Sequence, residues 1–311
     1  MSRAVRETGL KSKTPSWLSR NLLAECFYRL GANPRLRSVT IMHPLWAKPP
    51  SRPIALTNIA SISCLRVLCL RYIRKWNKHS RKELPSLPNL QVLHITLFVI
   101  TTVEESPLVI NHEKFPSLIT LEIYGGHKSS INVSSSCLSH LRTFSFGGSF
   151  DFSTSLHNGL LHGRIRNVLF AGTDHGRSRG FKLMLTCLSV ILSQLETVEL
   201  YIRRRHNIPR NSRGAHSTAS SDLPILECLY NGVSHHKPEY LRRVEIFVEP
   251  RTVVNGDRTS TRSIDEAIDS QIEELAISCL GHGISFEKTD QKLDVWIRNR
   301  LEMTLTKMPL I

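Results

Sequence analysis

A six-residue pattern recurs along most of this chain and limits its fold more than any other feature. In its fullest form the pattern is L-x-x-L-x-L, with Ile, Val or Phe also found at the apolar positions. The best-formed copy ends the stretch Leu84–Ile95, which has the sequence LPSLPNLQVLHI. Copies start at Leu36, Leu65, Leu90, Leu118, Leu141, Ile165, Leu195 and Leu241, with a degenerate copy at Leu226. The first seven starts are 23–30 residues apart, a spacing typical of proteins built from stacked repeats.

The pleat of a β-strand explains the pattern. Positions four and six of each hexad are two residues apart, so their side chains point to the same side of a strand. Position one packs beside them where the chain enters the strand. A single repeat cannot bury this apolar row alone, so neighbouring repeats must stack. Three hexads follow a lead-in phrase whose proline disfavours helix in the residue before it: Leu87-Pro88-Asn89, Phe115-Pro116-Ser117 and Leu223-Pro224-Ile225.

The phrases LPNLQVLHI and FPSLITLEI carry a family resemblance. Over roughly residues 34–248 the chain resembles leucine-rich repeat proteins, especially the irregular repeats of fungal F-box/leucine-rich repeat proteins. The resemblance implies an α/β leucine-rich repeat solenoid, an irregular horseshoe with a parallel concave sheet and helical ends. It also implies a substrate-receptor-like role of the ubiquitin-ligase type. No F-box-like helical segment is found, since about thirty residues precede the first hexad and most of them are expected to form one helix.

The domain organisation follows from the placement of the hexads. A basic, flexible N-terminus is expected over residues 1–13, followed by a single solenoid over 14–311. Within the solenoid we expect a capping helix at 14–31, repeats at 34–248, a mobile polar insertion at 203–222 and a C-terminal helical cap at 263–306. Such a cap would close the end of the repeat stack with a polar outer surface.

The candidate binding residues lie on the expected concave face. Hexad positions five and seven point away from the core, and three repeats place Glu and then an aromatic residue there. Aromatic side chains flanked by charge suit protein recognition, although ordinary strand composition explains the pattern equally well. A basic or amphipathic segment of a partner protein would fit this surface better than nucleic acid. The candidates are Arg71, His94, Glu122, Tyr124, Glu199, Tyr201, Glu245 and Phe247.

An arginine-rich run supports the alternative function, binding of nucleic acid or phosphate. The chain carries 41 Lys and Arg against 26 Asp and Glu, a net charge of +15, which favours anionic partners. The run is a candidate anion-binding or nuclear-import segment, but a solvated loop is also consistent with it. It lacks the interleaved aromatic residues of single-strand binders. Its members are Arg203, Arg204, Arg205, Arg210 and Arg213.

The sequence carries no catalytic, metal or cofactor motif, so we expect neither an enzyme nor a bound cofactor. The seven cysteines include no C-x-x-C pair, and several stand among leucines. This usage is typical of reduced cysteines in an intracellular protein, cytoplasmic or nuclear. The longest apolar run, Leu183–Leu192, is too short to cross a bilayer.

Overall fold

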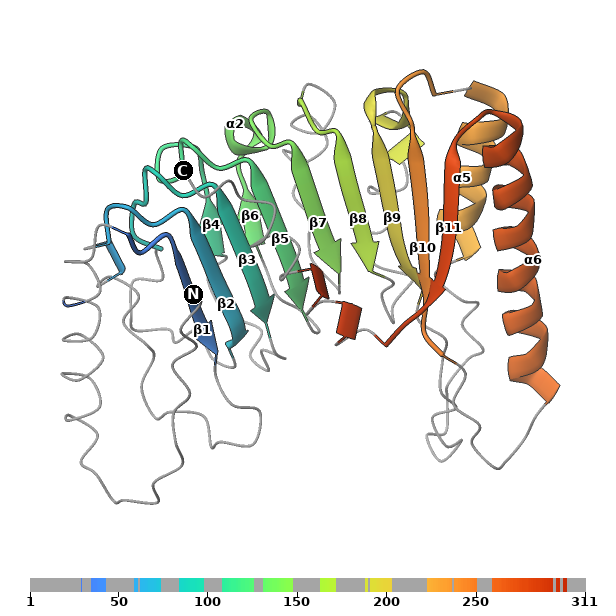
Figure 1. Cartoon of the computed structure of the whole chain (residues 1–311), viewed down its shortest axis with the longest axis horizontal. Helices are drawn as coiled ribbons and strands as arrows, with labels where there is room; N and C mark the ends of the chain where they lie inside the picture. The colour runs from blue at the N-terminus through green and yellow to red at the C-terminus, as the bar shows by residue number, and fades with distance from the viewer. Residues whose placement is uncertain are drawn as a thin grey trace, which may run out of the picture.

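The computed structural model describes residues 29, 35–42, 59–60, 62–73, 84–97, 108–125, 131–147, 163–171, 188–189, 191–202, 223–236, 238–250, 259–292, 295–296 and 299–300. Its dominant element in these ranges is a nine-stranded parallel sheet whose strands follow one another in chain order (Figure 1). The strands are β1 (Ser38–Met42), β2 (Val67–Ile73), β3 (Val92–Leu97), β5 (Thr120–Gly125), β7 (Thr143–Gly147), β8 (Asn167–Ala171), β9 (Thr197–Ile202), β10 (Arg243–Val248) and β11 (Ser285–Asp290). The protein is therefore an α/β fold with a solenoid-like arrangement, as the hexad spacing predicts.

Backbone hydrogen bonds at the start of each strand align the hexads. The N–H groups of hexad positions two and three both donate to the carbonyl of position two in the preceding hexad. Arg66 and Val67 bond in this way to Arg37 O, at 2.8 and 2.9 Å. Glu196 and Thr197 bond likewise to Arg166 O, at 2.7 and 3.1 Å. Equal hexad positions therefore stand side by side across the sheet.

One side of the sheet carries the hydrophobic core. Apart from the degenerate copy at Leu226, positions one, four and six of the hexads from Leu65 onward are all buried and form parallel apolar rows. Figure 1 shows helix α5 (Leu223–His236) and a second, two-stranded sheet on this side, behind the strands. That small sheet pairs β4 (Leu108–Ile110) with β6 (Ile131–Val133) and precedes the short helix α2 (Ser135–Leu138). The hexad pattern does not predict the β4–β6 pair.

The degenerate hexad at Leu226 is a wrong prediction, because that segment lies in α5 and not in a strand. The buried residues Ile225, Leu226, Leu229 and Val233 follow helical spacing. Pro224 is the second residue of the helix, where its missing N–H costs no intrahelical bond. The chain from β9 to β10 is thus a helical crossover, like the crossover from β10 to β11 through α6 (Thr259–Gly281).

The last part of the chain extends the sheet. Helix α6 packs against α5, where Ser234 Oγ and Ser278 Oγ are hydrogen bonded at 2.8 Å. β11 then pairs in parallel with β10 over six residues. The expected cap at 263–306 therefore adds a ninth strand before the chain continues onto the sheet. The expected N-terminal segment 1–13, the insertion 203–222 and all of the helix at 14–31 except Arg29 lie outside the described residues.

We predict that the rows of core leucines dominate stability. Leu93 on β3 is fully buried, so Leu93→Ala should lower the free energy of unfolding by about 2–5 kcal/mol, through lost apolar burial and a residual cavity. Ile119 stands at hexad position two and is 39% exposed, so Ile119→Ala should change the same quantity by less than about 0.5 kcal/mol. Urea denaturation followed by circular dichroism measures both. Equal effects of the two substitutions would contradict this description of the core.

Candidate functional site

The side of the sheet opposite the core, which we call the front face, carries two rows of candidate residues. It faces the viewer in Figure 1. The row of hexad position five is Cys69, His94, Glu122, Ser145, Leu169, Glu199, Glu245 and Glu287. The row of position seven is Arg71, Thr96, Tyr124, Gly147, Ala171, Tyr201, Phe247 and Thr289. The strand register thus brings the predicted residues of distant repeats onto one surface.

This surface is covered by a later segment of the same chain. Residues 291–300, which we call the strap, follow β11 and run back toward the C-terminal ends of β5 and β7 (Figure 1). The strap is described at 291–292, 295–296 and 299–300. Among the described strap residues, Trp296 and Arg300 contact the front face through their side chains.

Trp296 lies within a cluster of aromatic residues from three strands. Its ring centroid is 5.7 Å from Tyr124 in an edge-to-face arrangement, 5.3 Å from Tyr201 and 5.8 Å from Phe247. These are favourable distances for aromatic pairs. The Tyr201 hydroxyl also donates to the Gln291 carbonyl at 3.1 Å. Trp296 is only 2% exposed, so the cluster forms a small second core on the front face.

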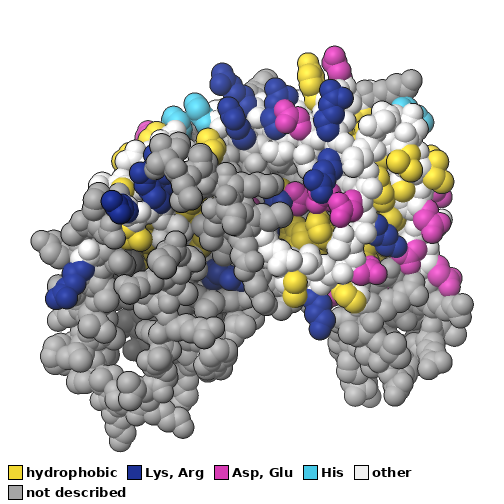
Figure 2. Space-filling view, viewed as in Figure 1, with side chains coloured by type: hydrophobic (Ala, Val, Ile, Leu, Met, Phe, Trp, Pro, Cys, Tyr) yellow, Lys and Arg dark blue, Asp and Glu magenta, His cyan; other side chains and the backbone are white. Residues whose placement is uncertain are grey.

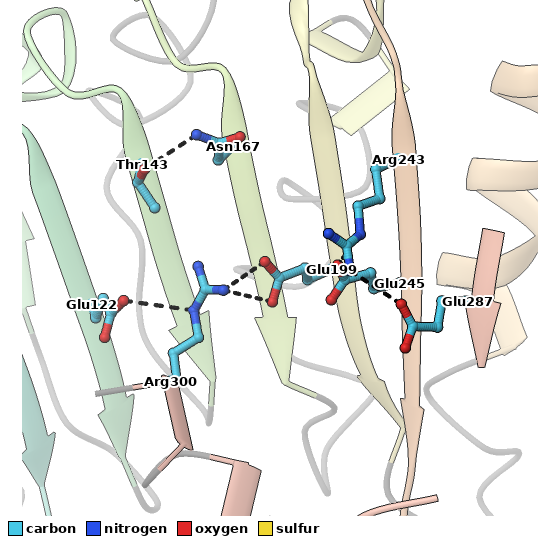
Figure 3. Close-up of polar contacts among 8 residues, drawn as sticks. All are labelled: Glu122, Thr143, Asn167, Glu199, Arg243, Glu245, Glu287 and Arg300. Atoms are coloured by element: carbon cyan, nitrogen blue, oxygen red, sulfur yellow. Dashed lines mark hydrogen bonds and ion pairs between the residues drawn. The ribbon is translucent and has the colours of Figure 1, made fainter. Parts of the chain in front are cut away.

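Arg300 joins two carboxylates that come from strands far apart in the sequence. Its Nη1 donates to both carboxylate oxygens of Glu199, at 2.5 and 2.8 Å. Its Nε lies 3.8 Å from Oε1 of Glu122 (Figure 3). All three side chains are largely buried, where hydrogen bonds between charged groups are stronger than in water. Burial opposes the charge of Arg300, but Glu199 and Glu122 raise its pKa above the ordinary value.

His94 holds the other oxygen of Glu122. Nδ1 of His94 lies 2.8 Å from Oε2 of Glu122 and donates to it, since an ionised carboxylate only accepts. Nε2 of the same ring is hydrogen bonded to Oγ1 of Thr96 at 3.0 Å. Burial alone would raise the pKa of Glu122, but the hydrogen bond and charge of His94, with the charge of Arg300, hold it below its ordinary value. Glu122 is therefore an ionised carboxylate inside the protein.

Acidic side chains of the front face extend beyond the two carboxylates that Arg300 contacts. Burial raises the pKa of Glu199 despite Arg300, and the neighbouring charges of Glu245 and Glu122 raise it further. Beside it, Arg243 bonds to Glu245 and, at 3.1 Å, to Glu287 (Figure 3). Figure 2 shows acidic side chains next to exposed apolar atoms in the hollow of this face, with Lys or Arg side chains beside them. The site is thus acidic and aromatic within a basic protein.

These contacts cover part of the expected binding surface. His94, Glu122, Tyr124, Glu199 and Tyr201 do stand on the face opposite the core, but all five are buried. Their neighbours Glu245 and Phe247 are half-buried, and Arg71 stands on β2, two strands from Tyr124. The arginines expected to bind anions, Arg203, Arg204, Arg205, Arg210 and Arg213, lie outside the described residues.

Sequence reasoning missed Trp296 and Arg300. The hydrophobic spacing places Trp296 on the apolar side of a capping helix and assigns no role to Arg300. One signal could have found them: several carboxylates fall on one face of the sheet, and a tryptophan and an arginine four residues apart follow the last strand.

Other chemistry is sparse in the part of the chain that the structure describes. There, no three His, Cys, Asp or Glu residues gather to hold a metal ion. Burial raises the pKa of Cys69, Cys137 and Cys279 to about 12, so these thiols stay protonated. None of the described helices is both long and apolar enough to cross a membrane.

Comparisons with known proteins add no identification: no family model, no curated protein and no solved structure matches this chain.

We predict that Arg300 holds the strap on the front face. In a chain whose other tryptophans (Trp17, Trp46 and Trp76) are changed to Phe, the fluorescence of Trp296 should resist quenching by acrylamide, because the ring is buried. Adding Arg300→Ala should make Trp296 several-fold more accessible to quencher, since the paired carboxylates then gain by returning to water. Asn299→Ala, at an exposed neighbouring position, is the matched control. Unchanged quenching in the Arg300 variant would contradict the assignment.

We predict a pH-dependent contribution from Glu122. Because its folded-state pKa is lowered, ionised Glu122 stabilises the fold above its unfolded pKa of about 4.3, and this contribution disappears as pH falls through the lower, folded value. Glu122→Gln should therefore cost about 3–5 kcal/mol of unfolding free energy near pH 7, as expected when one partner of a buried pair is removed. The difference from wild type should shrink steadily below about pH 4.3. A difference that stays constant with pH would refute this description of Glu122.

Proposed function

We propose that this protein is a non-catalytic protein-interaction module of the leucine-rich repeat class, and that its front face recognises a basic or amphipathic segment of a partner protein. One observation supports this most directly: the face already holds an arginine and a tryptophan supplied by its own chain. Residues that bind an arginine and a tryptophan of their own chain can bind the same side chains of a partner protein.

The charges of the front face favour a protein partner over a polyanion. Glu122, Glu199, Glu245 and Glu287 occupy the same row of the sheet. Arg300 and Arg243 offset part of this negative charge, and the acidic charge that remains favours cationic groups over phosphates. The net charge of +15 belongs to the chain as a whole, so the alternative, nucleic-acid binding, would use residues other than this row of glutamates.

The likeness of the hexads to those of F-box/leucine-rich repeat proteins supports a more specific proposal. In that class the repeats select the protein to be modified, and the same role here would make the front face a substrate receptor of the ubiquitin-ligase type. Such a role requires binding and no catalytic group. With this role we expect the protein in the cytoplasm or nucleus.

Affinity purification followed by mass spectrometry tests this function. Glu245 and Phe247 border the strap and are half-buried, so the double variant Glu245→Lys/Phe247→Ala should lose most of the proteins recovered with wild type. Glu227→Lys, at an exposed position of α5, makes the same charge change away from the face and should retain them. Recovery of ubiquitin-ligase adaptor subunits would support the receptor role. Identical recovery with both variants, or recovery abolished by nuclease, would contradict front-face protein binding.

A further inference from the structure

We propose that the strap is an internal ligand which competes with the partner, and that the partner presents an aromatic residue followed four positions later by an arginine on one side of a helix. This inference rests on the proposed function and specifies its partner. It follows from four features of the front face: the spacing of the strap residues, a gap in the aromatic row, the distance between two carboxylates, and polar atoms that the strap leaves unsatisfied.

The strap presents its two contact residues as a helix would. Trp296 and Arg300 are four positions apart and both have helical backbone. The Trp296 N–H donates to the Lys292 carbonyl at 2.9 Å, the bond of one helical turn. Residues four apart lie on the same side of a helix. Both side chains can therefore reach the sheet together.

The aromatic row has a gap that fits one large ring. Between Tyr124 on β5 and Tyr201 on β9, the register places Gly147 and Ala171, residues of the two smallest types. Adjacent strands are about 4.8 Å apart, so the two tyrosines are separated by roughly 14 Å. Trp296 lies between them, with ring centroids 5.7 and 5.3 Å from theirs. A partner that takes the place of the strap would therefore fill this gap best with an aromatic residue.

The acidic row fits one forked cation in the same way. Glu122 and Glu199 are separated by β7 and β8, where Ser145 and Leu169 contribute no charge. A guanidinium can meet both carboxylates because its donors point in several directions in one plane. Arg300 does so, with two bonds to Glu199 and a longer contact to Glu122. Lysine, a compact charge, would reach only one of them.

The strap satisfies the site incompletely, which makes it displaceable. Oε1 of Glu122 and Nε1 of Trp296 are buried, and neither has a hydrogen-bond partner among the described residues. Glu245 and Glu287 also leave acidic charge beside the strap. A partner helix with one further basic residue or hydrogen-bonding group would fit better. The strap still weakens the apparent affinity for a partner, because a ligand attached to the same chain acts at a high effective concentration.

A binding experiment in trans tests the inference. The probe is a fluorescein-labelled peptide with the sequence of residues 289–303, and its anisotropy reports binding to the full chain. The peptide should bind the variant Trp296→Ala/Arg300→Ala at least about 10-fold more tightly than wild type, because the intact strap reduces the fraction of open sites. Arg300→Ala alone should give a smaller gain in the same direction. Asn299→Ala should match wild type, and circular dichroism checks that every variant is folded.

Altered peptides test the required spacing. A peptide with Glu in place of its arginine, or with the arginine moved from four to six positions after the tryptophan, should lose at least about 10-fold in affinity for the open variant. Equal affinity for wild type and the open variants, no binding to any folded variant, or indifference to the spacing would overturn the inference. Those results would not bear on the proposed function, which the affinity purification tests separately. Conversely, if the peptide binds but no partner proteins are recovered, the proposed function is contradicted, while the strap is still shown to be an internal ligand.

Discussion

The bond pattern at the start of each strand determines much of this structure. The carbonyl of hexad position two accepts two N–H groups from the next repeat, as Arg37 does from Arg66 and Val67. This fixes the register, and a shift of one residue would turn every side chain to the opposite side of the sheet. Because the register holds from repeat to repeat, positions one, four and six gather into one core. Positions five and seven gather on the front face in the same way.

On the front face the same alignment brings charged residues together, and their burial has an energetic cost. Glu122 and Glu199 are buried beside His94 and Arg300. Buried charges are tolerated only when they are paired and hydrogen bonded. The strap supplies that pairing, and the aromatic contacts of Trp296 exclude water around it. The strap thus covers acidic residues of the front face. It does so with an arginine and a tryptophan, the same chemistry that we propose for the partner segment.

The sequence predicts the parts of this structure that depend on local repetition. A parallel sheet in chain order and the buried leucines of positions one, four and six follow from the strand pleat. The segment at Leu226 shows the limit of that reasoning. Leu226 and Leu229 are three residues apart, a spacing that occurs both in the hexad and in an α-helix. The next buried apolar side chain, Val233, follows Leu229 by four positions, and this spacing indicates a helix. Contacts over long sequence separations are not predictable in this way: the pair between Arg300 and Glu199 spans 101 residues, and only the accumulated charge of the front face hints at it.

The most direct test of the central claim, that the strap is bound to the sheet through Arg300 and Glu199, is a double-mutant cycle on the free energy of unfolding. Arg300→Ala, Glu199→Gln and the double variant are compared with wild type by urea denaturation. Buried, hydrogen-bonded charges in contact should give a coupling energy of about 1.5–3 kcal/mol. A coupling energy within about 0.3 kcal/mol of zero, as found for independent sites, would contradict the account.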